Sequence, residues 1–350
     1  MAGIEAETRP QGHEDAVVFA CDMGHLPLAA FAADRIRRVE PARAFDITVC
    51  MPDIADLPDW LRDGPTRFCQ ISTSALPKVE TFRSWISAAT YFRWVLPGAF
   101  EGAYRSLLYL DTDTYQARDG IGALFAGLDR PVPLAAVEDF QYLAPLHGKT
   151  VGHLEALRRD LGGPEGQYYN AGVLLIQPGP FAAQDGFSRL LDGVARNAPF
   201  DPVYGEQDQG ALNLAFAGDL MPLSPRFNWC ARPFRNPILT PRYDPVILHF
   251  AGRNKPWQLQ DDPFVAQFTA EYRDWLARHF PGFQPKPVRG SAAERLAAPK
   301  YRIGALNTLR VALYRRRFLK EQQRIWSRDM DEKIRRMDAA MARAVVGRAV

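Results

Sequence analysis

The stretch that decides the fold reads Leu107-Leu108-Tyr109-Leu110-Asp111-Thr112-Asp113. Its apolar part predicts a buried strand over residues 106–110, and two carboxylates follow it directly, one residue apart. In open α/β sheets, ligands bind outside the carboxyl ends of the strands. Two carboxylates there repel each other unless a cation joins them, and Mg²⁺ or Mn²⁺ accepts carboxylate and phosphate oxygens together. The spacing therefore suits a metal that joins the protein to a diphosphate, although a solvated turn gives the same pattern.

Apolar runs on both sides of this stretch extend the predicted sheet. Short strands are expected at residues 16–20, 45–49, 133–137, 172–177 and 246–250, and helices at residues 26–38 and 82–96. Continuous apolar strands that alternate with helices are typical of a mainly parallel central sheet flanked by helices on both faces. Pro and Gly cluster at residues 281–290. We therefore expect an α/β domain over residues 16–285, a flexible lead-in at residues 1–15 and a basic helical tail at residues 290–350.

The composition excludes several classes of protein. The chain has 350 residues, 47% of them hydrophobic. No stretch approaches the ~18 consecutive apolar residues of a membrane-spanning helix, and the polar N-terminus does not resemble a signal peptide. The four cysteines form neither a CxxC pair nor a zinc spacing: Cys21, Cys50, Cys69 and Cys230. We expect them to be buried thiols in a cytoplasmic protein.

Charge is distributed unevenly along the chain. Residues 300–350 carry 14 Lys and Arg against 5 Asp and Glu, whereas the remainder carries 29 against 35. This tail also holds Tyr301, Tyr314, Phe318 and Trp326, so it suits an anionic surface on the inner face of the cytoplasmic membrane. A helix pair that packs on the domain or forms a dimer seam is the alternative. Because no nucleic-acid reading module accompanies the basic residues, we expect no nucleic-acid partner.

The segment around residues 246–257 combines a predicted strand with a polar loop. His249, near the strand end, is a candidate third metal ligand, and imidazole favours Mn²⁺ over Mg²⁺. Gly252 permits close approach of the backbone, and Lys255 offers a point charge to a phosphate. A structural histidine and a surface lysine are the simpler interpretations.

Amide and acidic groups stand at the ends of two further predicted elements. Asn170 precedes the strand at residues 172–177 and could bond sugar hydroxyls, while the small residues after it leave room for a sugar ring. Asp208 and Gln209 fall at the expected N-terminus of a helix, near its positive end. A capped turn and ordinary helix capping explain the same patterns.

Taken in order, these segments resemble glycosyltransferase family 8, which includes bacterial lipopolysaccharide galactosyl- and glucosyltransferases and the glycogenins. The family pattern is a strand ending in D-x-D, then N-A-G-V, D-Q-x-x-L-N and H-x-x-G-x-x-K-P-W, and all four are present between residues 16 and 281. The resemblance implies a GT-A type nucleotide-diphospho-sugar transferase domain. It also implies retaining, Mn²⁺-dependent transfer of galactose or glucose from a UDP-sugar to a glycan or lipid-linked cell-surface acceptor, as in lipopolysaccharide biosynthesis.

The resemblance further implies a role for each matching residue. The metal would be held by Asp111, Asp113 and His249, and the donor diphosphate would meet Gly252 and Lys255. The remaining matches are Asp22 and Gly24 in the nucleotide loop, Arg93 facing the donor, and Asp139, Asn170, Asp208 and Gln209 around the donor sugar. Gly24 stands where the bacterial galactosyltransferases of this family often carry Asn.

The mechanism and two rival functions stay open at this point. Gln209 matches the position near the anomeric carbon, and an amide is a poor nucleophile. A same-face route, with Gln209 stabilising the cationic sugar and the leaving phosphate acting as base, is therefore favoured over a covalent route through Asp208 or Asp139. A UDP-sugar hydrolase or nucleotidyltransferase would use the same residues. A nonenzymatic nucleotide-sugar binding module would have little need for the full set of ligands and the lysine.

Overall fold

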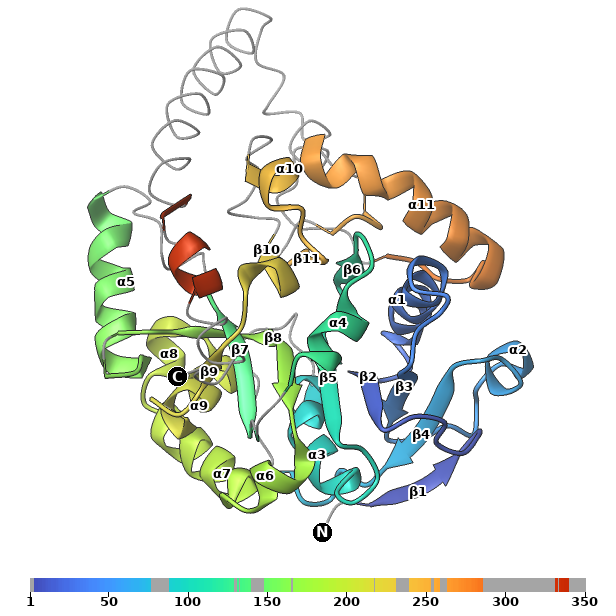
Figure 1. Ribbon diagram of the computed structural model, residues 1–350, viewed down its shortest axis with the longest axis horizontal. Coiled ribbons are helices and arrows are strands. Elements are labelled where there is room, and N and C mark those ends of the chain that lie inside the picture. Colours follow the sequence, from blue (N-terminus) through green and yellow to red (C-terminus); the bar gives the residue numbers. More distant parts are fainter. Residues whose placement is uncertain are drawn as a thin grey trace, which may run out of the picture.

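The computed structural model describes residues 3–76, 88–128, 131, 133–139, 148–164, 166–216, 218–230, 239–252, 255–258, 263–285, 331–332 and 334–339. Within these residues, the centre of the molecule is an eight-stranded sheet in the order β1-β4-β3-β2-β5-β8-β7-β9 (Figure 1). Its strands are β1 (Ile4–Glu7), β2 (Asp15–Ala20), β3 (Asp46–Met51), β4 (Arg67–Ile71), β5 (Ser106–Leu110), β7 (Leu134–Glu138), β8 (Tyr169–Ile176) and β9 (Met221–Pro222). A large central sheet flanked by helices confirms the predicted α/β class.

The directions of the strands decide which residues meet at the edge of this sheet. β2 runs parallel to β3 and to β5, and β3 runs parallel to β4. β8 runs antiparallel to both of its neighbours, β5 and β7, so the sheet is mixed. The start of β8 therefore lies at the same edge as the ends of β5 and β7.

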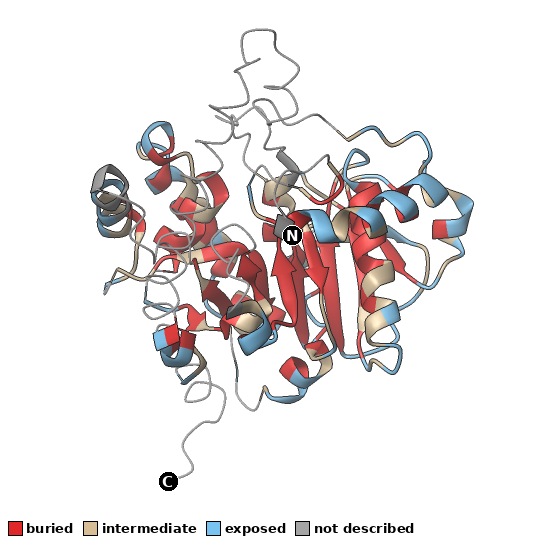
Figure 2. Cartoon of the chain, turned by 90° about the horizontal axis from the view of Figure 1, so that it is seen from above, coloured by how far each residue is buried: buried red, intermediate tan, exposed pale blue. Residues whose placement is uncertain are grey.

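Alternate residues of the strands pack into two cores, one on each face of the sheet. On β2, Val17 and Phe19 belong to one buried cluster, whereas Ala16 and Val18 belong to the other. The first core includes α1 (Leu26–Val39) and α11 (Pro263–His279); the second includes η1 (Ala88–Trp94), α3 (Leu96–Ala99), α6 (Pro178–Ala182), α7 (Gly186–Asn197) and α9 (Gln207–Ala215). Figure 2 shows buried strands between helices whose outer faces are exposed. Because both faces are covered, the strands read as continuous apolar runs, and each buried Val or Leu contributes about 1.5–3 kcal/mol.

The first predicted helix agrees with the structure, whereas the second differs from it. α1 begins at Leu26 as expected, with Pro27 in its first turn, where a missing N–H does no harm, and Arg37 and Arg38 in its last turn. The helix expected at residues 82–96 is described from residue 88, as the 3₁₀ helix η1 followed by α3. Pro97 does not end it, because it lies in the first turn of α3, where proline is tolerated. Residues 82–87 lie outside the described part. The other helices are α2 (Asp59–Arg62), α4 (Ile121–Ala126), α5 (Gly148–Leu161), α8 (Asp201–Tyr204), η3 (Pro225–Phe227) and α10 (Leu239–Tyr243). The four cysteines are buried free thiols, as expected: Cys21, Cys50, Cys69 and Cys230.

A second, three-stranded sheet stands at the edge where the candidate site lies. It consists of β6 (Thr114–Gln116), β10 (Trp229–Cys230) and β11 (Ile247–His249) in the order β10-β11-β6. The strand predicted at residues 246–250 therefore exists, but it belongs to this smaller sheet. β11 pairs antiparallel with β6 so that His249 faces Thr114, and Phe250 N donates to Asp113 O at 3.0 Å. This pairing places His249 next to the turn that follows β5.

Residues 4–7 take part in the sheet as β1, which differs from the flexible lead-in that the sequence predicts over residues 1–15. β1 pairs antiparallel with β4, with Ile4 opposite Ile71. Arg67 pairs with Glu7 and donates to Arg9 O at 3.2 Å, which anchors the strand and the residues after it.

A short part of the C-terminal tail packs on the domain. Of residues 331–332 and 334–339, Ile334 and Met337 are buried in the first core. Arg242 pairs with Asp331 at 3.1 Å, and the Ser224 hydroxyl donates to Asp338. The remaining tail residues, including the aromatic ones singled out in the sequence, lie outside the described part. In the portions of the chain that are described, none of the helices combines the length and the apolar character needed to cross a membrane.

Candidate active site

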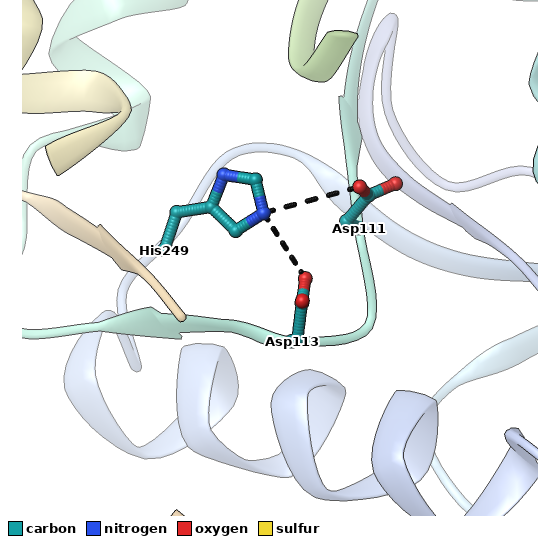
Figure 3. A group of neighbouring side chains, drawn as sticks. All are labelled: Asp111, Asp113 and His249. Atoms are coloured by element: carbon teal, nitrogen blue, oxygen red, sulfur yellow. Dashed lines mark ion pairs between the residues drawn. The ribbon is translucent and has the colours of Figure 1, made fainter. Parts of the chain in front are cut away.

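Three side chains converge at the carboxyl end of β5, as Figure 3 shows. Asp111 directly follows β5, Asp113 directly precedes β6, and His249 is the last residue of β11. His249 Nε2 lies 3.2 Å from Asp113 Oδ1 and 3.9 Å from Asp111 Oδ2. One ligand atom from each residue lies within 4.8 Å of the others, so the group could hold a metal ion.

The chemistry of this group fits a divalent ion. Mg²⁺ binds oxygen at about 2.0–2.1 Å, so two ligand atoms of one ion lie at most about 4.2 Å apart. The separations of 3.2 and 3.9 Å fall inside this limit. Asp113 Oδ1 is buried and accepts no hydrogen bond of good geometry within the described residues, and His249 Nε2 lies 3.2 Å from it, so both atoms could turn to a cation. Two carboxylates with one imidazole suit Mn²⁺ better than Mg²⁺.

The cluster has room because Gly172 carries no side chain. β8 runs beside β5, and Asp111 N donates to Gly172 O at 2.8 Å. A Cβ atom on Gly172 would lie only 2.3 Å from His249 Cε1 and 2.9 Å from Asp111 Oδ2. The sequence predicts that the small residues here leave room for a sugar ring, and this stays a prediction. Gly172 makes room for two candidate metal ligands.

Arg93 pairs with two acidic side chains, one of the candidate metal ligands and Asp208 of α9. It is 4% exposed and pairs with Asp111 at 2.9 Å and with Asp208 at 3.4 Å. Its guanidinium also lies over the Tyr109 ring, 4.6 Å from the centroid. Burial lowers the pKa of Arg93, but Asp111, Tyr109 and Asp208 more than offset this, so the side chain stays charged. For Asp208, burial outweighs the attraction of Arg93 and raises the pKa to about 6.

Lys255 lies beside Asp113 and offsets its negative charge. Its ammonium pairs with Asp113 and donates to Phe250 O at 2.8 Å. Burial would raise the pKa of Asp113, but Lys255 and His249 hold it well below its ordinary value. Burial likewise lowers the pKa of His249, whereas Asp113 and Asp111 raise it more, and the net shift is upward. Negative and positive side chains thus lie in contact at this site, and a cation could bind to the two carboxylates.

Three of the predicted sugar-binding residues form a second cluster beside the first. Asn170 Nδ2 donates to Asp139 Oδ2 at 2.9 Å and to Gln209 Oε1 at 3.1 Å. Gln209 Nε2 donates to Asp139 Oδ2 at 3.1 Å and to Glu206 Oε2 at 3.3 Å. These side chains come from the end of β7, the start of β8 and the first turn of α9. The antiparallel direction of β8 is what places Asn170 next to Asp139.

The remaining predicted residues lie along the same edge. Asp22 follows β2, the parallel neighbour of β5, and its Oδ1 accepts from His25 N at 3.0 Å just before α1. Gly24 lies beside Asp22, since a Cβ atom on Gly24 would be 3.3 Å from Asp22 Oδ1. Gly252 follows β11 with a φ of +87°, a conformation that favours glycine. The loop residues 253–254 lie outside the described part.

Two side chains at the site were not predicted from the sequence. Tyr109 OH donates to Asp111 Oδ1 at 2.6 Å, although Tyr109 reads as one more apolar residue of β5. Asn228 is fully buried between η3 and β10 and contacts both His249 and Asn170. A polar residue among the aromatic neighbours Phe227 and Trp229 is the only sequence signal for it.

Comparison with known proteins decides the family. The sequence profile described as Glycosyl transferase family 8 matches residues 16–261, more than half of the chain. The chain belongs to glycosyl transferase family 8. This family 8 protein is therefore a glycosyltransferase. General stress protein A of Bacillus subtilis (strain 168) is 26% identical to it over 208 residues, which are 55% of this chain and 67% of that protein.

Solved structures support the fold of this family 8 chain. The galactosyltransferase LgtC, solved with donor and acceptor sugar analogues, matches with a TM-score of 0.59 and 23% identity over 74% of this chain and 95% of LgtC. The bifunctional glycosyltransferase WbbM matches with a TM-score of 0.50 and 20% identity over 75% of this chain and 50% of WbbM. The predicted GT-A type fold is confirmed.

Proposed function

We propose that this family 8 enzyme transfers a hexose, galactose or glucose, from a UDP-sugar to a glycan or lipid-linked cell-surface acceptor with retention of configuration. The convergence of Asp111, Asp113 and His249 beside a buried amide and carboxylate cluster carries this proposal. A donor diphosphate bound at the first cluster would present its sugar to the second. In this proposal the first cluster would bind the diphosphate of a nucleotide sugar, and the second cluster would bind its sugar.

Each charged residue of the first cluster has a role in this proposal. Asp111, Asp113 and His249 would hold Mn²⁺, which when bound neutralises negative charge on the departing diphosphate. Lys255, which pairs with Asp113, would contact the phosphates and stabilise the charge that builds on UDP. Gly252 lets the backbone approach the phosphates closely. Asp22 and Gly24 would face the nucleoside.

The second cluster is suited to a same-face transfer. The bond between the anomeric carbon and the phosphate oxygen breaks, the acceptor oxygen bonds to the same face of that carbon, and its proton passes to the phosphate. Gln209 would stabilise the cationic sugar, and its amide is held in place because Oε1 accepts from Asn170 Nδ2 and from Ala171 N. Asp208 is a poor candidate for a covalent nucleophile because it is buried and paired with Arg93. We expect Asp208→Asn to keep measurable turnover; complete loss, with a trapped glycosyl-enzyme in the wild type, would favour the covalent route.

Release of UDP from a panel of UDP-sugars tests the function. The wild type and Asp113→Asn would each be assayed with Mn²⁺ and with EDTA, with and without surface-glycan acceptors. Mn²⁺-dependent release from one donor, lost in the variant, would support the proposal and name the sugar. Free sugar without any acceptor dependence would instead favour a hydrolase. Binding of UDP without turnover of any donor would favour a binding module.

A further proposal concerns the basic tail and the membrane on which a lipid-linked acceptor would lie. We propose that its Lys and Arg residues meet an anionic membrane surface, supported by the charge count of residues 300–350. Packing of Ile334 and Met337 on the domain favours the alternative for that short segment. Flotation with anionic and with neutral vesicles would compare the full chain with a variant in which Arg315, Arg316 and Arg317 are changed to Ala. Equal recovery of both proteins on anionic vesicles would reject membrane binding by this stretch.

A further inference from the structure

One buried amide joins the two clusters of the site. Asn228 has no exposed surface and stands between η3 and β10. Its Oδ1 lies 2.9 Å from His249 Nδ1, and its Nδ2 donates to Asn170 Oδ1 at 2.8 Å. The Cys230 thiol also donates to Asn228 Oδ1, at 3.8 Å. A single side chain therefore touches a candidate metal ligand on one side and a candidate sugar ligand on the other.

The partners of Asn170 decide which end of the Asn228 amide is oxygen and which is nitrogen. Asn170 faces the Asp139 carboxylate, which accepts, and the Gly172 N–H, which donates to Asn170 Oδ1 at 2.9 Å. These two partners fix which end of the Asn170 amide is oxygen. Asn228 must then turn its NH₂ group toward Asn170 and its oxygen toward His249. An amide oxygen only accepts, so in neutral His249 the ring hydrogen lies on Nδ1.

We infer that Asn228 is a positioning residue that fixes the His249 ring with Nε2 facing the metal, and that it couples the metal site to the donor-sugar cluster. The inference rests on the proposed metal role of Asp111, Asp113 and His249. Nε2 is the nitrogen that faces both carboxylates, at 3.2 and 3.9 Å. Metal-binding histidines generally donate their other N–H to a fixed acceptor, and loss of that acceptor typically weakens metal binding by about 10–100-fold.

Two substitutions at this position separate the two contacts. Asn228→Ala removes the acceptor for His249 and the donor to Asn170 together. Asn228→Asp keeps an acceptor facing His249 Nδ1 but places a second acceptor against Asn170 Oδ1. We therefore expect Asn228→Ala to weaken both metal binding and donor binding. Asn228→Asp should keep the metal affinity and weaken only donor binding.

The test measures Mn²⁺ affinity by calorimetry with no nucleotide present, and the donor KM and kcat separately. Gln177→Ala is the matched control, because it removes a buried amide that bonds Ser106 at the opposite end of β8. For Asn228→Ala we expect about 10–100-fold weaker Mn²⁺ binding, with Gln177→Ala unchanged. For Asn228→Asp we expect Mn²⁺ binding within about threefold of the wild type and a donor KM raised at least about tenfold, with a smaller change in kcat.

Nitrogen-15 spectra of histidine-labelled, metal-free protein, recorded at a pH that leaves the ring neutral, give a readout that a merely structural role would not move. His249→Gln identifies the His249 signals. The wild type should show hydrogen on Nδ1, and Asn228→Ala should lose this preference. Wild-type Mn²⁺ affinity in Asn228→Ala, or the ring hydrogen on Nε2 in the wild type, would overturn the inference. Absence of Mn²⁺ binding in the wild type would instead reject the proposed metal site itself.

Discussion

A methyl group at Gly172 should damage the site more than the fold. Its Cβ atom would lie 2.3 Å from His249 Cε1 and 3.0 Å from His249 Nδ1. Carbon atoms pack at about 3.5–4.0 Å, so the imidazole would have to move by about 1.2–1.7 Å. Overpacking of this kind destabilises a protein by about 1–3 kcal/mol. A metal site tolerates ligand shifts of only about 0.2 Å, and a 1 Å displacement can lower a rate by on the order of 100-fold.

The assay for Gly172→Ala combines urea unfolding with Mn²⁺-dependent release of UDP. We expect a folded variant, less stable by about 1–3 kcal/mol, with Mn²⁺ affinity and turnover lower by at least about 100-fold. Gly179→Ala is the control, because nothing lies within 4 Å of a Cβ atom at that position of α6. Normal Mn²⁺ binding and turnover in Gly172→Ala would show that His249 and Asp111 do not need the space beside this glycine.

Three further predictions follow from burial and charge. Burial raises the pKa of Asp208 to about 6. The unfolded value is about 3.9, so ionisation destabilises the fold as pH rises from about 4 to 6, by up to about 3 kcal/mol above that range. Asp208→Asn should therefore have a higher melting temperature than the wild type at pH 8 in EDTA, and the two melting temperatures should converge near pH 4. An equal difference in melting temperature at both pH values would contradict this. Ile334→Ala should lower the free energy of unfolding by about 2–5 kcal/mol in urea, because Ile334 is fully buried, whereas exposed Arg336→Ala should change it by less than about 0.5 kcal/mol. Mn²⁺ at 100 times its Kd should stabilise the wild type by about 2.7 kcal/mol and leave Asp113→Asn unchanged in a calorimetric melt.

The central strands of the fold were predictable because their residues are buried on both faces. β2 and β5 read as continuous apolar runs, and the observed strands begin and end within a residue of the predicted ones. β1 gives no such signal, since Glu5, Ala6 and Glu7 are exposed and its stability comes from pairing with β4. The antiparallel direction of β8 could not be predicted from the sequence either, because the direction of a buried strand depends on how its connections cross the sheet.

The site was predictable where its residues follow strands in recognisable motifs. Asp111, Asp113 and His249 were predicted together, and the structure brings them together. Asn228 could not be predicted, because its importance comes from a contact with His249 that forms only in the folded protein. The purpose of Gly172 was likewise interpretable only once β8 was seen to run beside Asp111.

Coupling between Mn²⁺ and UDP tests the central claim most directly. Mn²⁺ binding to the wild type and to Asp113→Asn would be measured by electron paramagnetic resonance, with and without UDP. If the carboxylates and His249 hold an ion that meets the donor diphosphate, UDP should tighten Mn²⁺ binding, and Mn²⁺ should tighten UDP binding by the same factor. Asp113→Asn should lose this coupling. Equal UDP affinity in Mn²⁺ and in EDTA would contradict the claim.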